Sequence, residues 1–239
     1  MNRVTNLSVV LALSLVSAAQ AGEVTAYSIA SNGGSASSNA VASGNANATA
    51  YSAATNGGRA VSNSEAIGRG WGIANSNSVA IADRGLAVSN SRADARGFWG
   101  GRSIANSDST AVTVGGVAIS NSLAEADARF NSHADSRSSS LALSRFGVAT
   151  SDSRATSDGL FGGRAVAISD SVADTFGGVS DSSVRAHAGA RNFGSASANG
   201  LGVSVSGPRQ RAVSRVTAIG RAERFGRSRA NGVSVEIRR

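Results

Sequence analysis

A repeat of 31 residues constrains this chain more than any single residue does. Four consecutive blocks, residues 77–107, 108–138, 139–169 and 170–200, align without a gap. In every block the second and thirteenth positions are serine, the fourth and seventeenth are alanine, and the ninth is glycine. A fixed period of this size indicates structural units that stack and bury their faces against one another.

Each block contains two similar half-units, which begin in the first block at Asn77 and Asn90. Successive half-units along the chain are 13 to 18 residues apart. The shorter step fits two short strands and two tight turns, which is one coil of a narrow solenoid. We therefore predict an all-β fold, a repetitive β-solenoid or β-roll with 13–18-residue coils and a 31-residue double-coil period. Each coil would rise about 4.8 Å and each block roughly 9.6 Å.

Alternation along the half-units predicts which side chains face inward. In residues 87–95 the odd positions are all alanine or serine, and the even positions range from aliphatic to charged. A period of two is typical of a strand, and the invariably small row fits a tightly packed interior. The first half-units add an aliphatic row on the opposite face. That row is either the true interior of the coil or a surface that packs against another chain; it comprises Val79, Ile81, Val112, Leu141 and Leu143.

Composition agrees with a chain that is almost entirely strand. Proline, which removes a ladder donor, occurs once, at Pro208. There is no cysteine, so neither a disulfide nor a thiolate metal site can stabilise the fold. Glycine, alanine and serine dominate and only 5% of the residues are aromatic, so the core must be thin.

The first 21 residues have the pattern of a signal peptide. Arg3 supplies the positive charge, residues 7–16 form an apolar stretch too short to span a bilayer, and residues 19–21 read Ala-Gln-Ala. We expect cleavage after Ala21 and export to the extracellular space or the bacterial cell surface.

Charge divides the rest of the chain in two. Residues 22–208 contain 13 arginines and 13 acidic residues, whereas residues 209–239 contain nine arginines and two glutamates. The boundary near Pro208 therefore separates a neutral repeat body, 22–208, from a basic, arginine-rich C-terminal segment, 209–239, which carries +7.

Three segments resemble the "NSVAIG" repeat of the YadA-like heads of trimeric autotransporter adhesins: residues 77–82, residues 63–68 and residues 217–220. The resemblance covers roughly residues 26–205. It implies a left-handed β-roll, three chains packed through aliphatic rows, and binding to host or matrix surfaces. The chain departs from that family in its 18-residue steps and in lacking a heptad stalk and recognisable membrane-anchor strands.

Motifs for catalysis and for cofactors are missing. The two histidines, His133 and His187, are far apart in the sequence and not at a metal-ligand spacing. No G-x-S-x-G elbow occurs, and the repeated aspartates stand where other blocks have turn-forming asparagine. We predict a protein that is not an enzyme and that has no small-molecule substrate, cofactor or metal.

Aromatic residues beside arginine in glycine-rich loops, and the basic segment, are the candidate contact sites. Exposed aromatic and arginine side chains are common in recognition surfaces, although these aromatic residues could instead cap the thin core. The arginines suit polyanions. The candidates are Trp71, Phe98, Trp99, Arg102, Phe161, Arg164, Arg221, Arg224, Arg227 and Arg229.

These features predict an exported structural or adhesive repeat protein that attaches to cell surfaces or to a biofilm matrix. Its partners would be further copies of itself, as a trimer or a fibre, and a polyanion, polysaccharide or other cell-surface ligand. The alternative is a self-assembling extracellular fibre subunit of the functional-amyloid, curli-like kind, because the ends of stacked coils can template addition. An ice-binding protein is a further alternative, although regular T-x-T rows are missing.

Overall fold

The computed structural model describes residues 23–30, 34–43, 46–55, 57–70, 72–97, 102–130, 133–207, 210–224 and 226–238. Within these ranges the chain forms twelve β-strands and no helix, which confirms the predicted all-β fold. The strands are β1 (Glu23–Ala30), β2 (Ser35–Ser43), β3 (Ala46–Ala54), β4 (Arg59–Gly70), β5 (Ile73–Ala82), β6 (Gly85–Gly97), β7 (Arg102–Arg129), β8 (His133–Leu160), β9 (Arg164–Arg191), β10 (Ser195–Ser206), β11 (Ala212–Glu223) and β12 (Arg227–Arg238).

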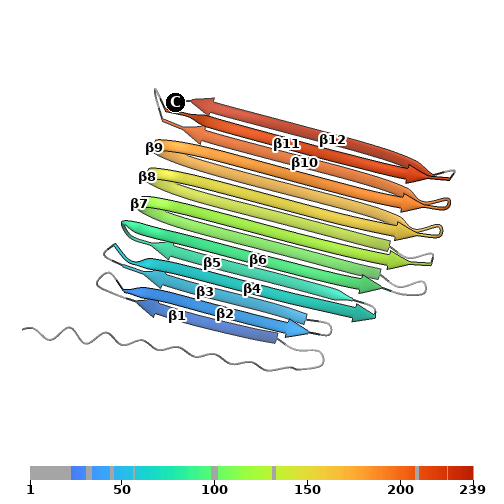
Figure 1. The fold of residues 1–239 in the computed structure, drawn as a ribbon, viewed down its shortest axis with the longest axis horizontal. Helices are drawn as coiled ribbons and strands as arrows, with labels where there is room; N and C mark the ends of the chain where they lie inside the picture. The colour runs from blue at the N-terminus through green and yellow to red at the C-terminus, as the bar shows by residue number, and fades with distance from the viewer. Residues whose placement is uncertain are drawn as a thin grey trace, which may run out of the picture.

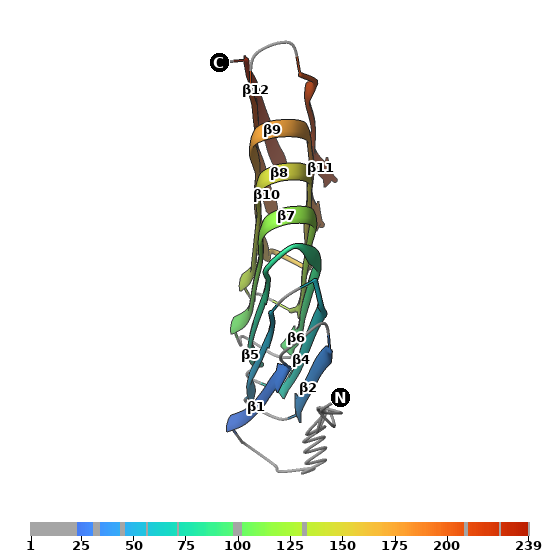
Figure 2. The ribbon, with the colours of Figure 1, turned by 90° about the vertical axis from the view of Figure 1, so that its left-hand side faces the viewer.

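The strands build a β-solenoid with two facing parallel walls, which the chain visits in alternation (Figure 1). The first wall runs β1-β3-β5-β7-β8-β9-β10-β12, and the second runs β2-β4-β6-β7-β8-β9-β11. The long strands β7, β8 and β9 contribute their first halves to the first wall and their second halves to the second. Figure 2 shows these three strands bending from one wall to the other at one long edge of the solenoid.

The 31-residue period is confirmed, but the path within it differs from the expectation. Arg102 is paired with His133, and His133 with Arg164, so residues 31 apart are neighbours in the same wall. Each half-unit is therefore one long strand rather than a closed coil of two short ones, and a block rises by one strand spacing of about 4.8 Å. The first turns are shorter, since Glu23 pairs with Asn47 and Ala46 with Ala74. This explains why the ungapped alignment starts only at residue 77.

The interior between the walls consists almost entirely of alanine and serine, as the alternation predicted. Fully buried alanines come from both walls, for example Ala111 from the first and Ala124 from the second. Serines fill the remaining inward positions near the middle of each strand. Because no larger side chain separates them over most of their area, the walls approach much closer than the about 10 Å of ordinary facing sheets.

Serine hydroxyls connect the two walls. Ser120 Oγ donates to the carbonyl oxygen of Ser109 at 2.7 Å, and Ser109 Oγ donates to the carbonyl oxygen of Ser89 at 2.7 Å. The same pattern repeats one period later, where Ser140 Oγ donates to Ser120 O at 2.6 Å and Ser151 Oγ donates to Ser140 O at 2.7 Å. These bonds use the second acceptor site of carbonyl groups that also serve the strand ladders. Each contributes about 1 kcal/mol and holds the walls at one separation.

Where an inward serine becomes larger, the facing residue becomes glycine. Val184 is buried in the second wall at a position held by Ser153 one period earlier. A Cβ atom on Gly200 of the first wall would lie 2.9 Å from a methyl group of Val184. The paired change preserves the volume between the walls, as a close-packed interior requires.

Stacked glycines form the edge at which β7, β8 and β9 bend. Gly116 and Gly147 adopt φ values of 140° and 141°, which strain any residue that has a Cβ atom. A Cβ atom on either would also collide with the carbonyl oxygen of the glycine one turn earlier. The invariant ninth position of the repeat therefore reflects backbone geometry at this edge.

The aliphatic row lies on the outer surface of the first wall, so it is not the interior of the coil. Ile81 is 37% exposed, and Val79, Val112, Leu141 and Leu143 are half-buried among their outward neighbours. The chain alone leaves this row uncovered, and packing against another chain remains a prediction.

Outward asparagines form hydrogen-bonded ladders on both walls. On the first wall Asn106 Nδ2 donates to Asn75 Oδ1 at 2.8 Å, and on the second wall Asn121 Nδ2 donates to Asn90 Oδ1 at 2.9 Å. Each ladder joins equivalent residues of successive turns and reinforces the register between them.

The basic segment 209–239 is distinct in charge but continues the fold. Strand β11 pairs with β9 and strand β12 pairs with β10, both in parallel register. The inward positions of β12, such as Ala230 and Ser234, are exposed because no second-wall strand lies opposite them in the chain. Glu236 Oε1 accepts a hydrogen bond from the backbone N–H of Ser214 at 3.0 Å and covers part of the free edge of β11.

We predict that Ala124→Val destabilises the protein by about 1–3 kcal/mol, because two added methyl groups cannot fit between the walls. Ser183→Val adds an equally branched side chain at an outward position of the second wall, and we expect a change of about 0.5 kcal/mol or less. Urea unfolding followed by circular dichroism measures both. Equal stability of the two variants would contradict the assigned interior.

Candidate functional site

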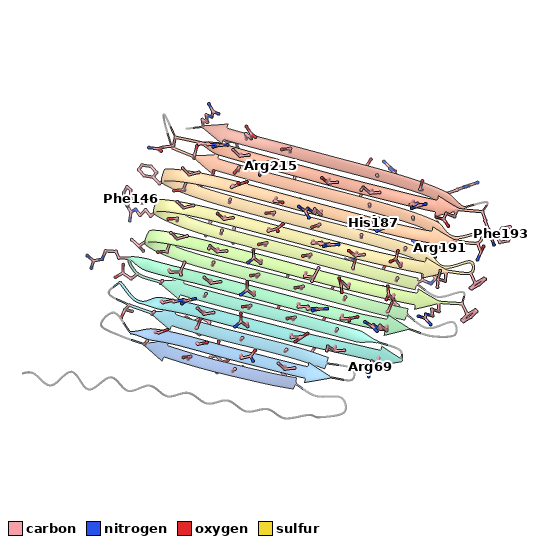
Figure 3. The ribbon with its side chains drawn as sticks, viewed as in Figure 1. Arg69, Phe146, His187, Arg191, Phe193 and Arg215 are labelled. Atoms are coloured by element: carbon pink, nitrogen blue, oxygen red, sulfur yellow. The ribbon has the colours of Figure 1, made fainter. Side chains whose placement is uncertain are left out.

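A row of phenylalanines marks the edge opposite the stacked glycines, where second-wall strands end and first-wall strands begin. We call Phe130, Phe161 and Phe193 the aromatic edge. The rings of Phe130 and Phe161 stack with centroids 5.2 Å apart and planes 4° apart. The three residues are 38%, 49% and 73% exposed, and Figure 3 shows Phe193 beyond the ends of the strands. A shallow hollow of about 490 Å3 separates Phe161 from Phe193 and is also lined by Asn192 and Arg224.

The aromatic edge stands on a strained backbone. Phe130, Phe161 and Phe193 have φ values of 58°, 53° and 68°, and Arg224 has a φ of 54°. Left-handed conformations are unfavourable for bulky residues and cost of order 1–3 kcal/mol each. The ladder nevertheless continues through this turn, since the N–H of Phe130 donates to the carbonyl oxygen of Leu160 at 3.1 Å. Strain that is kept at exposed aromatic residues points to a role beyond packing.

The predicted contact residues within the described ranges gather along this same edge. Arg102, Arg164 and Arg227 belong to one column at the start of the first-wall strands. Arg229 is two residues further along β12, and Arg221 and Arg224 lie at and just beyond the end of β11. The loops and the basic segment, which we inferred as separate contact sites, therefore form one surface. Trp71, Phe98 and Trp99 lie outside the described residues.

A groove runs beside the aromatic edge on the outer face of the second wall. It crosses β7, β8, β9 and β11 and has a volume of about 320 Å3. One side is the column Asp127, Asp158, Gly189 and Arg221. The other side is the column Arg129, Leu160, Arg191 and Glu223. His187 lines the groove beside Gly189, and Figure 3 shows it on the same wall as Arg191.

Gly189 opens the groove. Its column carries side chains in the neighbouring turns, but at this position only the carboxylate of Asp158 extends over the glycine. A Cβ atom on Gly189 would meet Asp158 Oδ1 and no backbone atom. Glycine is therefore not required by the backbone here, and its effect is to leave space on the surface.

Ion pairs organise the C-terminal end of the groove. Glu223 lies 3.0 Å from Arg221 and 3.6 Å from Arg191, measured between carboxylate oxygen and guanidinium nitrogen. Exposed pairs of this kind add little stability, so their main effect is to position the guanidinium groups.

The N-terminal end of the groove holds a partly buried carboxylate. Burial raises the pKa of Asp127 above its ordinary value, and the charge of Asp158 raises that pKa further. The Arg96 guanidinium acts in the opposite direction, and Asp94 and Glu125 add smaller upward contributions. Asp127 therefore gains from partners that donate hydrogen bonds or neutralise its charge.

The structure offers no arrangement for metal chemistry in the described part of the chain, where no three His, Cys, Asp or Glu side chains are grouped. His133 begins β8 on the first wall, whereas His187 lies on the second. No helix among the described residues is long and apolar enough to cross a membrane.

Sequence reasoning missed Phe130, Phe193 and the groove. The 31-residue column held the signal for Phe130, which stands exactly one period before Phe161 and one period after Trp99. Phe193 follows a one-residue shift of the register, so a fixed spacing does not reach it. The groove depends on a glycine among charged columns, which becomes visible only once the columns are aligned.

No known protein family, curated protein or solved structure matches this chain. The similarity of residues 77–82 to YadA-like heads is thus a resemblance of short segments.

We predict that Asp127→Asn raises the melting temperature at about pH 7. Because the pKa of Asp127 is raised on folding, the folded state holds its proton more tightly, and stability falls as the pH rises from about 3.9 through the raised pKa. The substitution removes that loss. At about pH 3, where the carboxyl group is protonated in both states, the variant and the wild type should melt alike. A lower melting temperature for the variant at neutral pH would contradict the assigned environment.

Proposed function

We propose that this protein is an exported structural or adhesive repeat protein that attaches to cell-surface or matrix polymers through its aromatic edge. The observation that carries the proposal is the collection of exposed phenylalanine and arginine side chains on one strained edge of a regular solenoid. The two walls supply a rigid support, since their strands are paired throughout the described turns and joined by serine hydrogen bonds.

The proposal of export rests on the sequence of residues 1–21, which lie outside the described residues. The fold is compatible with life outside the cell without disulfides. Backbone ladders, asparagine ladders and cross-wall serine bonds distribute the stability over every turn.

A non-enzymatic role fits the arrangement of the polar side chains. His133 and His187 belong to different walls, so neither can act with the other on one substrate. The groove beside the aromatic edge holds alternating carboxylates and guanidinium groups, a composition suited to binding hydroxyl-rich polymers.

Self-assembly into fibres is the second candidate, and the free end of the solenoid favours it. The inward row of β12 is exposed and repeats the small residues of the interior, as at Ala230 and Ser234. Two features oppose strand addition at this end: the inward Glu236 carboxylate and the outward charges of Arg227 and Arg229. Charged residues on an edge strand discourage pairing with another chain.

We predict that Phe161→Ala combined with Phe193→Ala weakens attachment to polysaccharide-coated surfaces about tenfold, a loss of about 1.4 kcal/mol. The matched control is Phe146→Ala with Phe176→Ala, which removes the aromatic pair at the glycine edge, where the ring centroids are 6.1 Å apart. Attachment is measured by surface plasmon resonance at several salt concentrations. The part that depends on arginine should fall with salt, because the Debye length is about 8 Å under physiological conditions.

Equal losses in both double variants would show that the aromatic edge has no special role. Wild-type protein that attaches to no surface but forms thioflavin-binding fibres would overturn the adhesive proposal in favour of self-assembly.

A further inference from the structure

We propose that the groove of the second wall binds one strand of an extended, neutral polysaccharide, which lies along the solenoid axis across β7, β8, β9 and β11. The inference rests on the proposed adhesive function and names the ligand class of its contact surface. It depends on the shape, charge balance and repeat of the groove rather than on the aromatic edge alone.

The shape of the groove fits a narrow chain. It lies between two columns of side chains on the same wall, and Gly189 leaves a gap in one column. The apolar side chain of Leu160 lies in the opposite column, where it can contact the C–H face of a sugar ring. A folded protein or a double-stranded nucleic acid would be too wide to enter a groove of about 320 Å3.

The charges of the groove balance. Three carboxylates, of Asp127, Asp158 and Glu223, face three guanidinium groups, of Arg129, Arg191 and Arg221. Carboxylates accept hydrogen bonds from sugar hydroxyl groups, and guanidinium groups donate to hydroxyl oxygens in bidentate fashion. A polyanion would gain from the arginines but would be repelled by Asp127 and Asp158. The balance therefore favours a neutral polymer in the groove, whereas the arginines of the aromatic edge favour anionic surfaces.

The repeat of the groove matches a linear glycan. Equivalent side chains in each column are separated by the strand spacing of about 4.8 Å. One pyranose unit of an extended chain advances by nearly the same length, so successive sugars meet successive turns of the solenoid. The partly buried Asp127 carboxylate, which has lost solvent, gains most from a hydroxyl donor.

The test uses Gly189→Leu, which fills the groove without touching backbone, since only Asp158 Oδ1 lies near the new Cβ atom. The matched control is Ser139→Leu, which adds the same side chain at an exposed position of the first wall. The probes are cellohexaose and chitohexaose as neutral chains and polygalacturonate as an anionic chain, measured by isothermal titration calorimetry with the full chain. Asp158→Ala is a second variant that removes one carboxylate without adding volume.

We expect wild type and Ser139→Leu to bind at least one neutral probe with equal affinity. Gly189→Leu and Asp158→Ala should each bind it at least tenfold more weakly, with melting temperatures that confirm folding. Unchanged affinity in both groove variants, or tighter binding of polygalacturonate that the groove variants abolish, would overturn the inference. Wild type that attaches to cell surfaces but binds neither neutral probe would refute the groove assignment alone. Wild type that attaches to no cell or matrix surface would refute the proposed function.

Discussion

The hydrogen bond from a serine hydroxyl on one wall to a backbone carbonyl on the other sets the dimensions on which the rest of the structure depends. The bond from Ser120 Oγ to Ser109 O is 2.7 Å long, which places the backbone of one wall within reach of a two-atom side chain from the other. Alanine and serine are the only common residues that fit such a gap, and Val184 fits because Gly200 lies opposite. The interior therefore repeats with little variation, and all chemical variety is moved to the outer faces and the edges.

Parallel in-register stacking turns that variety into columns. Any residue kept at one position of the repeat becomes a line of identical groups about 4.8 Å apart. The asparagine ladders, the aliphatic row of the first wall and the aromatic edge all arise in this way. A column interrupted by a smaller residue, as at Gly189, becomes a groove. Recognition by such a surface depends on repetition, which suits polymers that repeat at a similar distance.

Much of the fold could be predicted from the sequence, because the pattern of small residues has only one economical explanation. The alternation in residues 87–95 correctly placed alanine and serine inside, and the invariant glycines correctly marked a turn. The half-units were interpreted as complete coils because Asn77 and Asn90 begin similar strings, yet that similarity reflects two strands facing a common interior. Sequence alone could not show that Phe161 and Arg227 share an edge. That proximity depends on which positions of the 31-residue period lie at the bends.

The central claim is that one 31-residue block makes one turn, with its two half-units on opposite walls. Because the chain has no cysteine, an introduced pair reports on this directly. Thr110→Cys with Leu141→Cys places two thiols on adjacent strands of the first wall, where Cα atoms about 4.8 Å apart allow a disulfide. Leu123→Cys with Leu141→Cys joins equivalent positions of successive half-units, which lie on the outer faces of opposite walls. Mass spectrometry after mild oxidation should find an intramolecular disulfide in the first variant and free thiols in the second. A disulfide between residues 123 and 141, with none between residues 110 and 141, would contradict the account.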